Sequence, residues 1–190
     1  MGPRGPKILV FLRRWWPLPV LVGVSLFVQK TFFESRYDVS GHAAEHLMSA
    51  TAPFFASVLV AILFWVTPGA RRRVDVIVAA AAWWAATVLV LVGNVNVVDA
   101  LVEAGYGHAG TDDIPVPVDH GLANGAPWLG VVAALALTAV MWRRGHVSTG
   151  VAVGAALACL IVPPWIFPGA GVLVLVIARC LRPGSYRHAS

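Results

Sequence analysis

Charged side chains are scarce in this chain: Asp, Glu, Lys and Arg make up 12% of its 190 residues, whereas 58% are hydrophobic. A soluble domain usually carries about 25% charged residues. Here the few charges fall between long apolar runs, which is the pattern of helices that cross a lipid bilayer. The composition therefore excludes an ordinary soluble domain and indicates an integral membrane protein.

Other absences exclude several classes of chemistry. The chain has two cysteines, Cys159 and Cys180, and no Cys-x-x-Cys-His sequence, so covalent c-type haem attachment is excluded. It contains neither a Gly-x-Ser-x-Gly nucleophile motif nor a phosphate-binding loop. The middles of the apolar runs also lack Asp, Glu, Lys, Arg and His, the groups that pumps and ion-coupled transporters usually place there. A proton-coupled transporter or a charged pore is therefore disfavoured.

The apolar runs predict an all-α fold, a multi-pass transmembrane helical bundle with about six apolar segments in a single membrane domain, residues 1–190. Four segments are expected at about 15–33, 48–66, 74–93 and 126–142. The last stretch, 147–181, is too long for one crossing, since as one helix it would measure roughly 50 Å. Prolines divide it, and two alternatives stay open: a hairpin of two short spans, or a re-entrant loop.

The distribution of charge predicts the orientation. If six segments cross and both the N- and C-termini are in the cytoplasm, all of the 14 lysines and arginines except Lys30 and Arg36 lie on the inner side. Of the 9 acidic residues, only Asp75 lies on the inner side. Such an excess of Lys and Arg is typical of cytoplasmic segments, so we expect a cell-membrane protein and no nucleic-acid partner despite the basic composition.

The longest polar segment, 94–127, is expected to form an extracytoplasmic loop. Its stretch Asp99–Tyr106 could form a short amphipathic helix on the surface, and several glycines and prolines follow. Loops of this length are usually functional or disordered. This segment is therefore a candidate source of ligands for a site on the outer face.

The best candidate for chemistry is the stretch His42-x-x-Glu45-His46, just before an apolar run. If this stretch is helical, the three side chains fall within an arc of roughly 100° on one face. The pattern matches the H-x-x-E-H signature of inverted zincins, in which two histidines bind zinc and the glutamate activates a water. The match covers five residues and does not by itself indicate membership of that family.

A third metal ligand is expected from the polar segment. His120 is the favoured residue, with Asp119, His108 and Asp112 as alternatives. In this hypothesis His42, His46 and His120 bind the metal, zinc or another divalent ion, and Glu45 acts as a catalytic base or as a group that orients a ligand. Haem is less favoured. Its two axial histidines must approach opposite faces of the ring, so His42 and His46 on one helix turn cannot supply both, and the remaining arrangement is His42 or His46 opposite His120 or His108. The competing interpretation is a polar turn at the membrane interface.

Two functional hypotheses follow from these observations. The first is a non-catalytic membrane subunit or interaction protein. The alternative is a membrane metalloprotein or metalloenzyme with its site at His42, Glu45 and His46. The lipid bilayer is the expected partner in both. Gly150-x-x-x-Gly154 predicts a close-packing surface for another helix, in the same chain or in a second membrane protein or second copy.

Overall fold

The computed structural model of the protein describes residues 37–110, 120–164 and 168–181, together with Gly23, Phe27 and Ile114. All regular secondary structure in these positions is helical, which confirms the predicted fold class for this part of the chain. The helices are α3 (Gly41–Ser49), α4 (Ala52–Val66), the 3-10 helix η1 (Pro68–Arg72), α5 (Val74–Glu103), α6 (Gly121–Arg143), α7 (Thr149–Ile161) and α8 (Ala170–Leu181). The predicted first span, 15–33, lies outside the described residues except for two helical positions, Gly23 and Phe27.

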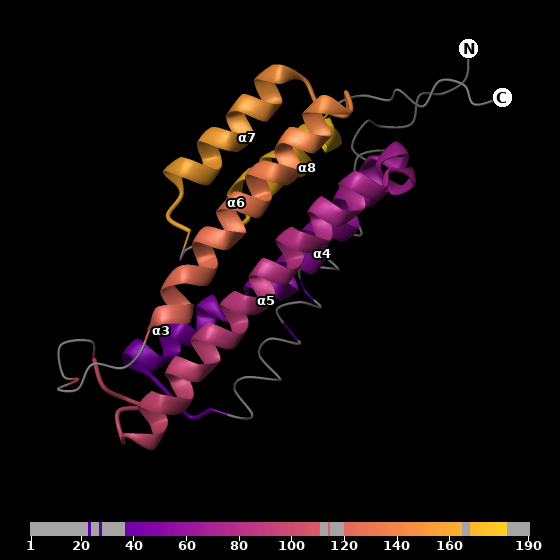
Figure 1. Ribbon diagram of the computed structural model, residues 1–190. Coiled ribbons are helices and arrows are strands. Elements are labelled where there is room, and N and C mark those ends of the chain that lie inside the picture. The colour runs from indigo at the N-terminus through magenta and orange to yellow at the C-terminus, as the bar shows by residue number, and fades with distance from the viewer. Residues whose placement is uncertain are drawn as a thin grey trace, which may run out of the picture.

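Three helical segments are long and apolar enough to cross a membrane: Gly41–Val66, which joins α3 and α4, then Val74–Glu103 and Gly121–Arg143. They run side by side along the length of the molecule (Figure 1). The helices α7 and α8 are shorter and form a hairpin at one end of this group. The described part of the protein is therefore a helical, membrane-type bundle.

The helix boundaries differ from those expected at the polar ends. Helix α3 begins at Gly41, inside the predicted connector 34–47, and the helix is broken only at Ala50 and Thr51, directly before Pro53. Helix α5 continues ten residues beyond the predicted end at Gly93, to Glu103. The predicted loop 94–127 is therefore helical at both of its ends, and no separate surface helix forms at 99–106.

Helix α3 begins where the chain turns against the segment that follows α5. Gly41 has φ +60°, a conformation that favours glycine, and a Cβ at this position would lie 2.5 Å from the carbonyl oxygen of Ala109. The backbone N–H of His42 donates to that same oxygen at 3.1 Å, and the N–H of Ser40 donates to Gly107 O at 3.0 Å. These contacts fix the direction in which α3 leaves the turn.

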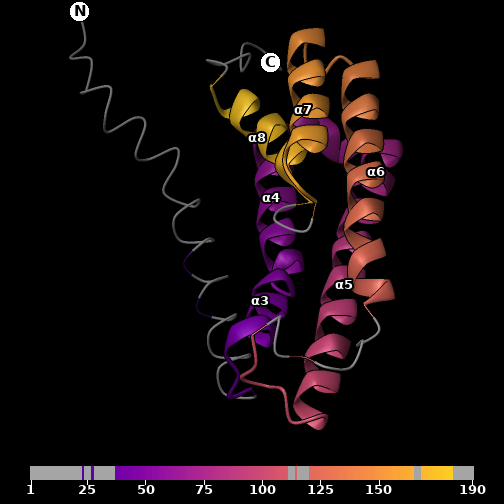
Figure 2. The ribbon, with the colours of Figure 1, turned by 90° about the vertical axis from the view of Figure 1, so that its left-hand side faces the viewer.

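The α7–α8 hairpin ends at the middle of the long helices. The indole N–H of Trp83, in α5, donates to the carbonyl oxygen of Pro168 at 3.3 Å, and a Cβ on Gly130 of α6 would lie 2.9 Å from the Pro168 side chain. With 13 and 12 residues, α7 and α8 are each about 18–20 Å long, short of a hydrocarbon core of roughly 30 Å. Pro168, just before α8, therefore lies beside the middle parts of α5 and α6, and α7 and α8 extend from this level toward one end of the bundle (Figure 2).

Close packing within the hairpin occurs at Gly171 and not at the predicted pair of glycines. A Cβ on Gly171 would lie 2.3 Å from Sγ of Cys159 and 2.6 Å from the carbonyl oxygen of Ala155. No described atom lies within 4 Å of a Cβ built on Gly150 or Gly154. The small residues that let α7 and α8 approach are thus Ala155 and Gly171, and both cysteines are free thiols.

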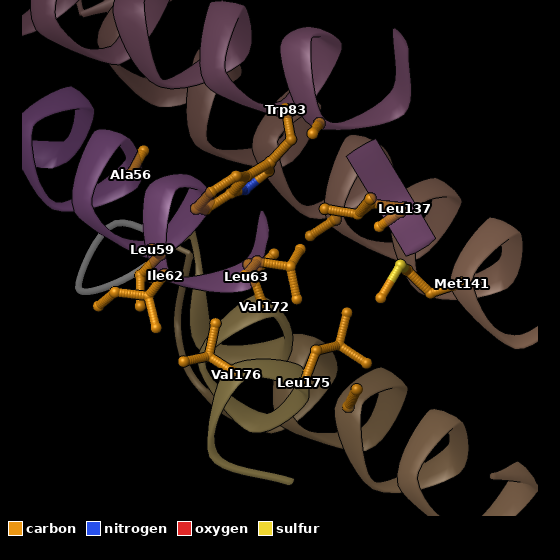
Figure 3. Close-up of a cluster of buried hydrophobic side chains, with 14 of the residues drawn as sticks. Ala56, Leu59, Ile62, Leu63, Trp83, Leu137, Met141, Val172, Leu175 and Val176 are labelled. Carbon is orange, nitrogen blue, oxygen red and sulfur yellow. The ribbon is translucent and has the colours of Figure 1, made fainter. Parts of the chain in front are cut away.

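The main hydrophobic core lies at the end of the bundle that the hairpin occupies. Trp83 is 1% exposed there, and Leu63, Leu137 and Leu175 from α4, α6 and α8 are fully buried around it (Figure 3). A much smaller cluster lies at the opposite end, made of Ala43, Val97, Leu101 and Ala123. The two ends of the bundle are therefore packed to different extents.

The end of the bundle with the large core also carries the arginines that the structure describes. Arg144 forms an ion pair with Asp75 at 2.6 Å. The guanidinium of Arg179 donates to Thr67 Oγ1 at 3.2 Å and to the carbonyl oxygen of His146 at 3.1 Å, so it joins α8 to two turns. Burial, and then the nearby Arg179, lower the pKa of His146, which keeps this imidazole neutral among the cations.

Candidate metal centre

At the other end of the bundle, α3 holds His42 and His46 on one face. The two residues are four positions apart, and side chains at this spacing lie one above the other on a helix. Their Nε2 atoms are 3.2 Å apart, and the ring centroids are separated by 4.6 Å. The predicted helical geometry of this stretch is therefore present, with both imidazoles directed to one point.

His120 reaches the same point from the start of α6, where it is the N-cap residue. Its ring centroid lies 5.7 Å from that of His42 and 5.2 Å from that of His46. One ring nitrogen from each of the three histidines can be chosen so that all lie within 4.8 Å of one another. Residues 74 positions apart in the sequence thus converge on one small volume.

Gly93 of α5 allows α6 to pack closely against α5 at the level of the three histidines. A Cβ on Gly93 would lie 2.7 Å from the backbone nitrogen of Ala123 and 2.8 Å from the carbonyl carbon of Leu122. Only hydrogen in place of a side chain allows the first turn of α6 to approach α5 so closely. This contact places His120, just before that turn, beside the histidines of α3.

Asn94, the next residue of α5, orients His46. Nδ1 of His46 lies 2.6 Å from Oδ1 of Asn94, while the Asn94 amide nitrogen donates to the carbonyl oxygen of Val90 at 2.8 Å. Because the amide nitrogen is engaged by Val90, Oδ1 accepts the proton of His46 Nδ1. The lone pair of Nε2 then faces His42 and His120, as in metal-binding histidines held by a carbonyl partner.

Glu45 lies on the opposite edge of His42. Its Oε2 is 3.5 Å from Nδ1 of His42, whereas the imidazole cluster is on the Nε2 side. The Glu45 side chain is 68% exposed, and that of His42 is 16% exposed. This position suits a carboxylate that orients a ligand, and it favours that role for Glu45 over a base at the cluster.

A hollow of about 260 Å³ adjoins the histidines. Its walls come from α3, α5 and α6, and they combine polar with apolar side chains. The lining residues are His42, Glu45, His46, Ser49, Val90, Asn94, Ala123, Asn124 and Pro127. A small molecule therefore has room beside the imidazole cluster.

Among the other predicted ligands, only His108 lies within the described residues. Its Nδ1 is 3.1 Å from the hydroxyl of Ser40, so it belongs to the turn before α3 and not to the cluster of three histidines. Asp112 and Asp119 lie outside the described residues. Asn94 was not predicted as a site residue, because residue 94 was expected at the start of a loop and not inside α5.

The arrangement suits a single metal ion better than haem. Imidazole nitrogens bind Zn²⁺ at about 2.0–2.1 Å, so two ligands of one tetrahedral ion are roughly 3.3 Å apart. The 3.2 Å between the Nε2 atoms of His42 and His46 agrees with this spacing. A bis-histidine haem needs its two ligands on opposite faces of the macrocycle, which His42 and His46, on one face of α3, cannot provide together.

Comparison with known proteins gives no relative: no protein-family model, no curated protein and no solved structure matches the chain.

Replacement of Asn94 by Leu, which has a similar volume, is expected to weaken metal binding by about 10–100-fold, the usual cost of losing an outer partner of a histidine ligand. The physical reason is that Nδ1 of His46 loses its acceptor, so neither tautomer nor ring orientation is fixed. A competition titration with a zinc-binding dye measures the affinity. Asn96→Leu, two residues along α5, is the control and should leave the metal affinity unchanged. Equal effects of the two variants would contradict the role of Asn94.

Proposed function

We propose that this protein is a membrane metalloprotein that binds one divalent transition metal, zinc being favoured, through His42, His46 and His120. The observation that carries the proposal is the convergence of three imidazoles, with ligand atoms within 4.8 Å, at one end of a membrane-type bundle. Imidazole ligands suit zinc, copper, iron and nickel. Three protein ligands leave a coordination position for an exogenous molecule, which is the arrangement of catalytic zinc sites.

The orienting contacts of two ligands also support the proposal. Metal-binding histidines almost always direct their second ring nitrogen to a carboxylate or carbonyl oxygen. Nδ1 of His46 faces Oδ1 of Asn94, and Nδ1 of His42 faces the carboxylate of Glu45. Both Nε2 atoms are thereby directed to the shared point. A role for Glu45 as a catalytic base stays a prediction.

Metal analysis of the detergent-purified protein tests the proposal. We expect close to one equivalent of a transition metal per chain after purification without chelators, and its return when zinc is added to chelator-treated protein. Elemental analysis by mass spectrometry is the measurement. Protein that neither retains a metal nor rebinds zinc would contradict the proposal. His42, His46 and His120 would then be polar residues at the membrane interface, and the non-catalytic membrane subunit would be the favoured function.

The orientation of the bundle belongs to the same proposal. We place the metal site on the extracytoplasmic side of the cell membrane. The arginine-rich end and both termini lie in the cytoplasm, because basic residues are retained on the inner side. The α7–α8 hairpin then enters from the cytoplasm as a re-entrant pair, and the first apolar segment and the three long helical segments cross. The short lengths of α7 and α8, and the position of Pro168 beside Trp83, support this arrangement.

Reporter fusions test the orientation. Fusions at Gly69, Gly145 and the C-terminus should report the cytoplasm, and fusions near Gly41 and Gly110 the outside. Labelling of a cysteine placed at Trp165, in protein whose two native cysteines are replaced by Ala, separates a re-entrant tip from a crossing, since only a crossing exposes that position to an impermeant reagent outside. A C-terminal reporter outside the cell would contradict the proposed topology.

A further inference from the structure

The length of the α3–α4 segment would place the three histidines at the boundary between the polar and apolar zones of a bilayer. Val66 ends α4 twenty positions after His46, which corresponds to about 30 Å of helix, the thickness of a hydrocarbon core. When the cytoplasmic end of this segment is at one boundary, His46 is therefore at the other. A ligand at the metal would lie at the depth of lipid headgroups.

The hollow beside the histidines extends from that depth toward the membrane interior. Ser49 lies one turn below Glu45 on α3, Val90 one turn below Asn94 on α5, and Pro127 one turn below Ala123 on α6. The three helices thus provide polar groups at the headgroup level, and Val90 and Pro127 make the space about 5 Å deeper more apolar. Such a gradient fits one end of an amphiphile better than a small polar molecule.

The charge of the site selects the headgroup. A divalent cation on three neutral imidazoles carries two positive charges, and Glu45 is the one carboxylate among the residues that line the hollow. Asn124 adds an amide to the same walls, whereas the Ser49 hydroxyl donates to the backbone carbonyl oxygen of Glu45 at 3.2 Å. The site therefore favours an oxyanion at the open coordination position, with the Asn124 amide as a hydrogen-bond donor in the same hollow.

On the basis of the proposed function, we propose that the ligand of the metal centre is a lipid with an anionic phosphate headgroup. Its phosphate occupies the open coordination position, and its acyl chains begin in the hollow between α3, α5 and α6. Glu45 and Asn124 form the exposed rim of the hollow. Because this end of the bundle is placed on the extracytoplasmic side, the lipid enters from the outer leaflet.

Cobalt(II) provides a spectroscopic probe of this binding. Cobalt replaces zinc at imidazole sites, and its visible absorption changes when an oxyanion enters the coordination sphere. Cobalt-loaded protein in detergent is titrated with two ligands that share one headgroup, dihexanoyl phosphatidic acid and glycerol phosphate. We expect the lipid to act at a concentration at least about tenfold lower, the gain expected when two methylene groups leave water.

Variants of the hollow separate this effect from simple partitioning of the lipid into the detergent micelle. Ser49→Phe fills the hollow, whereas Met48→Phe adds a similar ring at the neighbouring position, which is 64% exposed and does not line the hollow. We expect Ser49→Phe to remove most of the advantage of the lipid over glycerol phosphate, and Met48→Phe to keep it. Asn124→Phe, on the opposite wall, replaces Ser49→Phe if that variant does not fold.

Three results would overturn the inference. Equal advantages of the lipid in Ser49→Phe and Met48→Phe would show that the acyl chains do not occupy the hollow. A wild-type spectrum that responds equally to both ligands, or to neither, would exclude recognition of a lipid phosphate by the metal. Failure of the protein to bind cobalt or zinc at all contradicts the proposed function itself, and the metal content measured before the titration distinguishes that failure from the other two.

Discussion

Replacement of any one of His42, His46 and His120 by Ala is expected to lower metal affinity by at least about 100-fold, more than the 10–100-fold cost of losing an outer partner. Each of the three contributes one nitrogen to a cluster whose atoms lie within 4.8 Å, and two imidazoles alone hold a divalent ion weakly. Metal content after gel filtration, and a dye-competition titration, measure the loss.

His108→Ala is the matched control, because His108 is a histidine near this end of the bundle that contacts Ser40 and not the cluster. We expect this variant to keep full metal content. Expression and membrane insertion should be unchanged in all four variants, since none of them removes an apolar side chain. A His42→Ala, His46→Ala double variant that still holds one equivalent of metal would refute the assignment of these ligands.

Gly93→Ala is expected to destabilise the bundle by about 1–3 kcal/mol, the usual cost of overpacking, and to weaken metal binding at the same time. The added methyl group would lie 2.7–2.9 Å from three backbone atoms of Leu122 and Ala123, which cannot rotate away as a side chain could. Helix α6 must therefore move from α5, and His120 moves with it. A decrease in Tm of roughly 4–10 °C in detergent, together with reduced metal affinity, is the expected result.

Gly154→Ala is the control for the general effect of placing alanine at a helical glycine. No described atom lies within 4 Å of a Cβ at that position, so we expect no loss of stability and a gain of up to about 0.5–1 kcal/mol from the better helix former. Unchanged Tm and unchanged metal affinity in Gly93→Ala would show that α5 and α6 can separate without moving His120, and would contradict the close approach at Gly93 as the basis of the site.

Much of this fold follows from hydropathy alone, because helices in a bilayer need long apolar segments and the chain has little else. The ends of the helices do not follow from it. Asn94 and Asp99 look like the start of a loop on a hydropathy scale, yet Val97, Val98 and Leu101 continue the buried face of α5 at helical spacing. That 3.6-residue periodicity was the signal that could have extended the helix and placed Asn94 inside the bundle.

The histidine cluster could be anticipated in part. The spacing of His42 and His46 predicts that one helix face carries both, and the structure confirms this geometry, as it does the approach of His120. The orienting role of Asn94 could not be predicted, since it depends on which side of α5 faces α3. The close contact at Gly93 was equally hidden, because no pattern in the sequence distinguishes a glycine at a helix crossing from one that faces open space, such as Gly154.

The unequal division of the hydrophobic core has a consequence for the motions of the protein. The hairpin adds its side chains to the arginine-rich half, whereas the half with the histidines rests on the four-residue cluster Ala43, Val97, Leu101 and Ala123. Local opening requires the least free energy where the fewest apolar contacts are broken, so α3 and the last turns of α5 should exchange their amide hydrogens before the rest. A ligand that binds only the closed form suppresses such opening in proportion to its concentration. A metal bound by the three histidines would therefore hold this half of the bundle closed, and the extent of its opening would depend on the metal concentration.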